Sequence, residues 1–176
     1  MSYLTENEIL EIEGNVRLLS INEIVDISHY SFDSHIEEYN DFLNVAEKFY
    51  ELNISKTFLL VHKETKELLA YMALAADSIK LTNEEKETHE IGKVPYASIP
   101  ALKVGKLAVN KELSKEAARK GYGSFLLEMA RAFAFSMNEL GVACRFITVD
   151  ADIEYNSDTP AVSYTHLRAH ETKANL

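Results

Sequence analysis

The sequence predicts an α/β domain in which helices flank a mixed β-sheet. Three observations support this fold class. Apolar stretches at Thr57–His62 and Leu68–Ala75 flank a short polar segment, which is typical of a β-hairpin. An amphipathic helix is predicted before them, over 36–52. After them, between 101 and 151, a strand, a glycine-containing loop, a helix and another strand follow in the order of a βαβ unit.

The size and composition of the chain suit one domain with a sizeable core. It has 176 residues, of which 47% are apolar and 26% charged, as is typical of a soluble globular protein. No apolar run approaches the ~18 residues that a membrane span needs, and the acidic segment 1–14 is unlike a signal peptide. Cys144 is the only cysteine, so an internal disulfide is excluded. We therefore expect a cytoplasmic protein without membrane contact.

The formal net charge of −10 bears on the class of partner. An acidic surface disfavours bare nucleic acid, because phosphate contacts need lysine and arginine. It suits basic or neutral partners, which it attracts over long range. Solubility alone is the simpler explanation of the acidity.

The first half of the chain predicts a short strand, two helices and the hairpin. Residues 15–19 form the strand, and Ser20 with Glu23 forms a capping box that begins a helix over 21–28. The helix over 36–52 has apolar residues at helical spacing, namely Phe42, Val45, Ala46 and Phe49. Residues 63–67 join the hairpin strands. The polar stretch Ser78–Ile99 is predicted to be a partly helical excursion, which either shapes a substrate site or is a solvated loop.

The second half predicts the βαβ unit. A strand covers Ala101–Asn110, a helix covers Gly121–Leu140 and a strand covers Ala143–Ala151. The buried side of the helix carries Phe125, Leu126, Met129, Phe133 and Met137, and Gly141 supplies its C-cap. The two strands should be parallel. The loop between strand and helix contains Gly121 and Gly123, so backbone N–H groups and a helix N-terminus are predicted to surround an anion such as a phosphate.

These segments resemble the GNAT superfamily of acetyl-CoA-dependent N-acetyltransferases. The resemblance spans about 15–160 and is most specific in I-P-A-L-K-V-G-K-L-A-V (99–109), the glycine loop, and F-I-T-V-D-A (146–151). The family loop usually reads Gln or Arg, two residues, Gly, one residue, then Gly or Ala. Here Ala118 departs from that pattern. Either Arg119 supplies the missing charge from the next position or its side chain is simply solvated.

The resemblance implies acetyl-CoA as cosubstrate and no metal. It implies that Leu107, Ala108 and Val109 offer backbone groups to the pantetheine arm. The implied pyrophosphate site is Arg119, Lys120, Gly121, Tyr122, Gly123 and Ser124, and Asn156 is a further cofactor-binding residue. Gly121 and Gly123 would allow close backbone approach, because a Cβ there would push the phosphates away. An ordinary tight turn into a helix is the alternative interpretation of these glycines.

The implied chemistry is acetyl transfer to a primary amine. Backbone donors on the 107–109 strand would polarise the thioester carbonyl, and a carboxylate or a water chain would deprotonate the ammonium. No base is assigned: Asp77, Glu90 and Asp150 are candidates by position only. His62 and His89 are interpreted as structural or solvated.

The end of the chain departs from the family pattern. The general-acid tyrosine is expected near position 163, which is Ser163, so the catalytic residues stay unknown. From 162 the chain reads V-S-Y-T-H-L-R-A-H-E-T, which resembles the in-frame translation of a transposase-based sequencing adapter. We expect an acetyltransferase domain over 1–160, without its C-terminal strands and weakly active or inactive, and a non-native tail over 161–176. A genuine, divergent C-terminus is the alternative. Tyr164 is given no catalytic role, and the spacing of His166 and His170 is interpreted as accidental.

Three functions are consistent with the resemblance. The first is N-acetylation of a small molecule, a peptide or a protein. The second is a toxin-like acetyltransferase of aminoacyl-tRNA, which the 96–109 segment resembles but the acidic charge disfavours. The third is a non-catalytic acyl-CoA-binding module. An amine-bearing acceptor is the implied partner, nucleic acid other than charged tRNA is not expected, and a homodimer is compatible with each.

Overall fold

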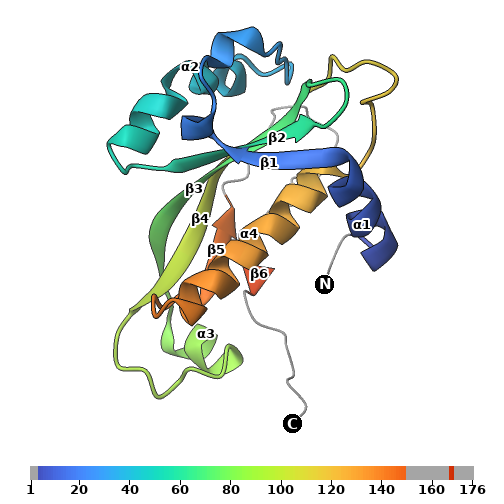
Figure 1. Ribbon diagram of the computed structural model, residues 1–176. Coiled ribbons are helices and arrows are strands. Elements are labelled where there is room, and N and C mark those ends of the chain that lie inside the picture. The colour runs from blue at the N-terminus through green and yellow to red at the C-terminus, as the bar shows by residue number, and fades with distance from the viewer. Residues whose placement is uncertain (1–3, 150–166, 169–176) are drawn as a thin grey trace, which may run out of the picture. The chain divides into compact units, whose positions relative to one another are not determined.

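The computed structural model describes residues 4–149 and 167–168. It divides into two compact units, Met1–Ala75 with Val104–Ala130 and Ala76–Lys103 with Arg131–Leu176. The described strands form one six-stranded sheet in the order β1-β2-β3-β4-β5-β6 (Figure 1). The strands are β1 (Val16–Ser20), β2 (Lys56–His62), β3 (Leu68–Lys80), β4 (Ser98–Val109), β5 (Phe146–Val149) and β6 (Leu167–Arg168). The helices are α1 (Glu6–Asn15), α2 (Glu37–Glu51), α3 (Asn83–Thr88) and α4 (Tyr122–Glu139), with the 3-10 turns η1 (Ile21–Glu23) and η2 (Ile27–His29).

The first unit begins its sheet with three antiparallel strands. Strand β1 pairs with β2, and β2 pairs with β3, which confirms the predicted first strand and the predicted hairpin. Leu19 lies opposite Leu59, and Leu59 lies opposite Tyr71. Because facing residues of neighbouring strands share a face of the sheet, these three side chains line one face together.

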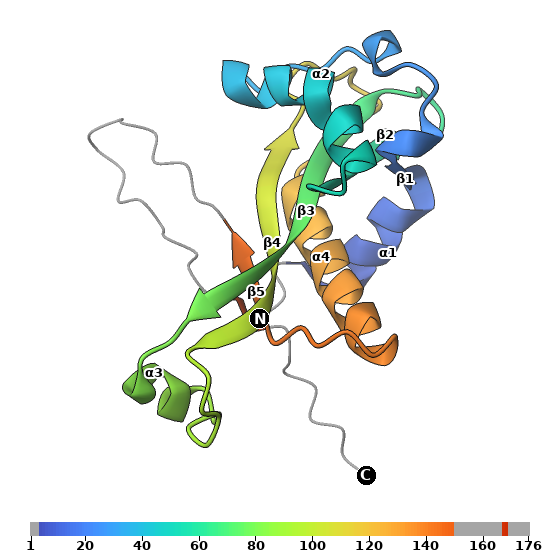
Figure 2. The same ribbon diagram turned by 90° about the vertical axis from the view of Figure 1, so that its left-hand side faces the viewer.

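Helix α2 covers that face. Its buried residues Tyr39, Leu43 and Ala46 belong to one apolar cluster with Leu59 and Tyr71, and the Tyr71 hydroxyl donates to the Tyr39 carbonyl at 2.7 Å. Figure 2 shows α2 on one face of the sheet, with α1 and the first half of α4 on the other. The predicted 36–52 helix is confirmed.

The predicted helix over 21–28 is wrong. The Glu23 carboxylate accepts from the Ser20 N–H at 2.6 Å, so the predicted cap contact is present. The chain nevertheless makes only η1 there, and Asp26 then caps η2 by accepting from the Ser28 N–H at 2.9 Å. The β-branched Ile24 and Val25 disfavour a continuous helix, and Ile24 and Ile27 pack on the α2 cluster instead.

Thr57 in β2 provides the first prediction. Its side chain is fully buried, and its hydroxyl has no hydrogen-bond partner among the described residues. A buried hydroxyl without a partner carries a desolvation cost. We expect Thr57→Val to raise the free energy of unfolding by about 1 kcal/mol, measured by urea denaturation. A variant less stable than the parent protein would contradict this expectation.

The second unit contains the excursion between β3 and β4 and the chain after Arg131. The excursion is partly helical, as predicted: α3 begins at a capping box of Thr82 and Glu85. Its small core consists of Leu81, Ile99, Ala101 and Phe146, with Ile79, Ile91 and Val94 around it.

Strand β5 starts beside the start of β4. The Arg145 N–H donates to the Pro100 carbonyl at 3.0 Å, and Figure 2 draws β5 and the first half of β4 running the same way, as the βαβ prediction requires. Gly141 has a φ of 86°, and the Val142 N–H donates to the Met137 carbonyl at 2.8 Å. This ending of α4 confirms the predicted glycine C-cap.

Strand β6 falls inside the predicted non-native tail. It pairs antiparallel with β5, with Arg168 opposite Phe146 and Leu167 opposite Ile147. The origin of the tail stays a prediction, because residues 150–166 and 169–176 lie outside the described part of the chain. Within the described part, no helix is long and apolar enough to span a membrane.

Candidate functional site

The loop over 110–121, which leads from β4 to α4, is anchored at its start by Asn110. This side chain is 4% exposed. Its amide nitrogen donates to the carbonyls of Ser31 and Leu68 at 3.0 and 2.8 Å. Its amide oxygen accepts from the backbone N–H groups of Asp33 and Glu112 at 3.2 and 3.0 Å. Asn110 therefore fixes where β4 ends and where the 110–121 loop leaves the sheet.

Glu67 holds the middle of the 110–121 loop. It lies at the end of the hairpin turn and accepts two hydrogen bonds from Ser114, from the N–H at 2.8 Å and from the hydroxyl at 2.6 Å. The Ser114 carbonyl in turn accepts from the N–H groups of Ala117 and Ala118. The hydrogen bonds from Ser114 lower the pKa of the Glu67 carboxyl, so Glu67 is an anion at neutral pH.

Gly121 is the residue that turns the loop into α4. Its φ of 100° is disfavoured for residues with a Cβ. The Phe125 N–H donates to the Gly121 carbonyl at 2.8 Å, which is the first bond of the helix. By helix geometry the N–H groups of Tyr122, Gly123 and Ser124 then lack a partner within the helix. Such unpaired donors at a helix start are suited to an anion.

Tyr122 has a structural task at this turn. Its hydroxyl donates to the Ala117 carbonyl at 2.7 Å, its side chain is 3% exposed, and burial raises the pKa of the hydroxyl. Because its side chain is buried and hydrogen-bonded, only the backbone of Tyr122 is available to contact a ligand.

A hollow of about 340 Å³ lies at this helix start. It brings together most of the cofactor-binding residues that the sequence predicted. Those residues are Val109, Arg119, Lys120, Gly121, Tyr122 and Gly123, and Asn110, Lys111, Leu113 and Ala118 complete the lining. Leu107, Ala108 and Ser124 do not line this hollow: Ala108 is buried, Leu107 contacts α4 at Gly123, and Ser124 follows within its first turn.

The predicted reason for a glycine at 123 needs correction. A Cβ on Gly123 would point at the side chains of Leu107 and Val109, 3.5 Å from each, which is an ordinary contact. It would therefore face β4 rather than an anion in the hollow, and the φ of Gly123 is not positive. The predicted requirement for glycine applies to Gly121 alone, where φ is positive and Leu4 lies 3.2 Å from the Cβ position.

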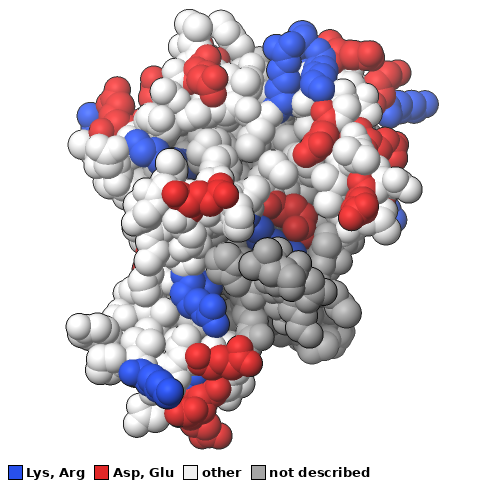
Figure 3. Space-filling model, turned by 60° about the horizontal axis from the view of Figure 1, so that its bottom comes forward, with Lys and Arg blue, Asp and Glu red and all other residues white. Residues whose placement is uncertain are grey.

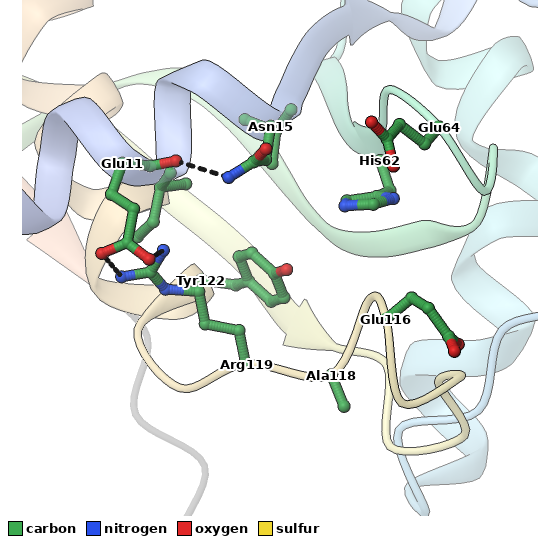
Figure 4. A pocket seen from close by; sticks show the side chains of 10 residues that line it. Glu11, Asn15, His62, Glu64, Glu116, Ala118, Arg119 and Tyr122 are labelled. Atoms are coloured by element: carbon green, nitrogen blue, oxygen red, sulfur yellow. Dashed lines mark hydrogen bonds and ion pairs between the residues drawn. The ribbon is translucent and has the colours of Figure 1, made fainter.

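Arg119 is held by α1 (Figure 4). Its two terminal nitrogens lie 3.0 and 3.1 Å from the two carboxylate oxygens of Glu11, so the pair is bidentate. Its charge is therefore shared with a carboxylate rather than free for a phosphate. Lys120, the next residue, is exposed. Of the two cations at the predicted pyrophosphate site, Lys120 is the better placed to meet a phosphate.

A second hollow, of about 440 Å³, lies on the α1 side of the 110–121 loop. It shares Ala118, Arg119 and Tyr122 with the first hollow, and Figure 4 shows His62 pointing into it. His62 is 7% exposed, and its Nδ1 accepts from the Thr65 N–H at 3.2 Å. That bond places the proton of the neutral ring on Nε2 and gives His62 a structural contact within the hairpin turn.

The other candidate bases belong to the second unit or lie outside the described residues. Asp77 accepts from the Thr148 hydroxyl at 2.7 Å. Glu90 is exposed and has a φ of 58°. The His89 ring lies edge-on to Phe146, with the centroids 5.1 Å apart. Asp150 is not described, nor are the predicted Asn156 and the positions Ser163 and Tyr164 at the expected acid.

On the face drawn in Figure 3, acidic and basic side chains are interspersed, so no large patch of one charge is seen there. Among residues 4–149 and 167–168, no group of three or more His, Cys, Asp or Glu side chains could hold a metal ion. Around the hollow before α4, the groups suited to an anion are the start of the helix and the exposed lysines Lys111 and Lys120.

Three residues that support the site were not predicted from the sequence, namely Glu11, Glu67 and Asn110. A polar residue directly after an apolar strand is a signal that could have indicated Asn110. The partners of Glu11 and Glu67 are 108 and 47 residues away, so no local pattern indicates them.

Solved structures share the fold of this chain. AtaT complexed with acetyl-methionyl-tRNAfMet aligns with a TM-score of 0.63 at 22% identity, over 80% of each chain. A KacT mutant aligns with a TM-score of 0.61 at 22% identity, and AtaTR bound with acetyl-CoA with 0.59 at 22%, each over 80% of both chains. No protein-family model and no curated protein sequence matches the chain.

Proposed function

We propose that this protein is an acetyl-CoA-dependent N-acetyltransferase whose cosubstrate places its pyrophosphate in the hollow before α4. The observation that carries the proposal is the start of α4: Gly121 turns the chain into the helix, and Tyr122 and Gly123 of its first turn line a hollow together with other motif residues. Acetyl-CoA is bound in the similar structures of AtaTR and of the AtaT toxin with its antitoxin AtaR.

The residues present fit an anionic cofactor. The backbone N–H groups of Tyr122 and Gly123, two residues that line the hollow, would hold the pyrophosphate, and the Lys120 ammonium would pair with it. The backbone of Leu107–Val109 would align the pantetheine arm along β4. The bound cosubstrate supplies an activated acetyl thioester. The chain's own contribution is to orient that group and to offer backbone donors where negative charge develops on its carbonyl oxygen.

For the acceptor we propose the α-amino group of an aminoacyl-tRNA. The supporting observation is the fold shared with AtaT, whose structure contains acetyl-methionyl-tRNAfMet. The net charge of −10 favours instead a small or basic amine. Acetyl transfer from radiolabelled acetyl-CoA to charged tRNA, and to the free amino acid at equal concentration, separates the two. Label in the free amino acid but not in the tRNA would replace this acceptor by a small amine.

Binding of coenzyme A tests the cosubstrate directly. Calorimetry on the full chain should show saturable binding, and Lys120→Gln should weaken it about tenfold, since a charge-assisted contact to phosphate is lost. Arg119→Gln is the matched control and should change the dissociation constant less than about threefold, because Glu11 already holds that guanidinium.

Two results would contradict the proposal. Absence of binding at millimolar coenzyme A would reject the cosubstrate. A larger loss with Arg119→Gln than with Lys120→Gln would show that Arg119 leaves Glu11 for the phosphate, and would reassign the cation of the site.

A further inference from the structure

Glu67 connects the β2–β3 hairpin turn to the 110–121 loop. Both of its carboxylate oxygens are used by one residue, since the Ser114 N–H donates to Oε1 and the Ser114 hydroxyl donates to Oε2. A bidentate acceptor of this kind fixes both the position and the orientation of its partner. The turn at Ser114 is therefore placed by a residue from a different part of the sheet.

A continuous series of hydrogen bonds runs from Ser114 to α4. The Ser114 carbonyl accepts from the Ala117 and Ala118 N–H groups at 3.2 and 2.8 Å. The Ala117 carbonyl accepts from the Tyr122 hydroxyl at 2.7 Å, and Tyr122 is the first residue of the helix. Each step involves a buried or half-buried group. A displacement of Ser114 would thus be passed on to the helix start that lines the hollow.

The surroundings keep Glu67 ionised. The Ser114 hydroxyl and N–H lower the pKa of its carboxyl most, and the Thr65 hydroxyl and the nearby His62 lower it further, while partial desolvation opposes them. His62 and Thr65 face Glu67 from the hairpin turn, and Ser114 faces it from the loop. The pKa of the Tyr122 hydroxyl is raised by burial and also by the negative charge of Glu67.

We infer that Glu67 is a positioning residue for the phosphate site, acting through Ser114 and the 114–122 hydrogen bonds on the backbone donors at the start of α4. The inference rests on the proposed cosubstrate, and it adds a residue outside the β4–α4 motif to the cofactor site. Glu67 does not line the hollow itself, so its effect should be on cofactor affinity rather than on the chemical step.

Three variants test this role. Glu67→Ala removes both acceptors and should weaken coenzyme A binding about tenfold. Glu67→Gln should restore most of the affinity, because its carbonyl can accept from the Ser114 N–H while its amide donates to the Ser114 hydroxyl. Glu64→Ala is the control in the same turn: Glu64 is exposed and Ser114 bonds to Glu67 instead, so its replacement should leave affinity unchanged.

Two measurements keep the test separate from the proposed function. Hydrogen exchange of the Ala117, Ala118 and Phe125 amides should accelerate in Glu67→Ala relative to Glu64→Ala, whether or not coenzyme A binds. The Michaelis constant for acetyl-CoA should rise in Glu67→Ala while kcat stays within about twofold.

Unchanged exchange at these amides would overturn the inference, even if no coenzyme A binds to any variant. Accelerated exchange with an unchanged dissociation constant would also overturn it. Failure of the parent protein to bind coenzyme A would reject the proposed function and leave the exchange result to decide whether Glu67 holds the loop.

Discussion

Replacing Asn110 with alanine is expected to lower the free energy of unfolding by about 3–5 kcal/mol. The amide of Asn110 bonds to backbone groups of Ser31, Leu68, Asp33 and Glu112. Alanine would leave these groups without their partner, and each buried group left unsatisfied costs about 1–3 kcal/mol. Urea denaturation followed by circular dichroism measures the change.

Two further variants make the Asn110 result specific. Asn44→Ala, at an exposed position of α2, should change stability by less than about 0.5 kcal/mol. Asn110→Asp keeps an acceptor for the N–H groups of Asp33 and Glu112 but loses both donors, so its stability should lie between those of the parent and of Asn110→Ala. A loss below about 1 kcal/mol in Asn110→Ala would show that water replaces the amide.

Gly121→Ala should lower stability by about 2 kcal/mol and weaken coenzyme A binding more than tenfold. The φ of 100° strains any residue with a Cβ, and that Cβ would also lie 3.2 Å from the Leu4 side chain. To relieve both, the backbone must shift at the N-terminus of α4, where the N–H donors are. Thermal denaturation and calorimetry on the same samples measure the two effects.

Substitutions at two other glycines distinguish the effect of backbone strain on stability from an effect on coenzyme A binding. Gly141 has a φ of 86° and nothing within 4 Å of its Cβ position, so Gly141→Ala should lose about 1 kcal/mol through strain alone and bind coenzyme A normally. Gly123→Ala meets ordinary contacts without positive φ, so its stability should match or exceed that of the parent. If Gly141→Ala loses as much affinity as Gly121→Ala, the helix start has no special place in binding.

The sequence predicted an element well where its apolar pattern and the turn or capping residues at its ends indicated the same structure. The polar 63–67 segment between apolar strands indicated the hairpin, and Gly141 indicated the end of α4. The box of Ser20 and Glu23 indicated a cap contact but not the length of the helix, because the β-branched Ile24 and Val25 disfavour its continuation and Ile24 and Ile27 pack on the α2 cluster instead.

Only the part of the candidate site formed by residues close together in the sequence could be predicted. The strand, the glycine and the helix gave most of the hollow's lining, since those residues are neighbours in sequence. The roles of Arg119 and Gly123 could not be predicted in the same way. One depends on a carboxylate in α1 and the other on side chains in β4, and such tertiary contacts leave no periodic signal.

The packing of α1 against the 110–121 loop has a practical consequence for work on this protein. Leu4 and Ile12 lie next to Gly121, and Glu11 pairs with Arg119, so residues between 4 and 12 support the 110–121 loop. A purification tag fused directly to Met1, or a trimmed amino terminus, would alter this support and change apparent cofactor affinity without touching the motif. A tag joined through a long flexible spacer would leave these contacts intact, so that the measured affinity would be that of the protein itself.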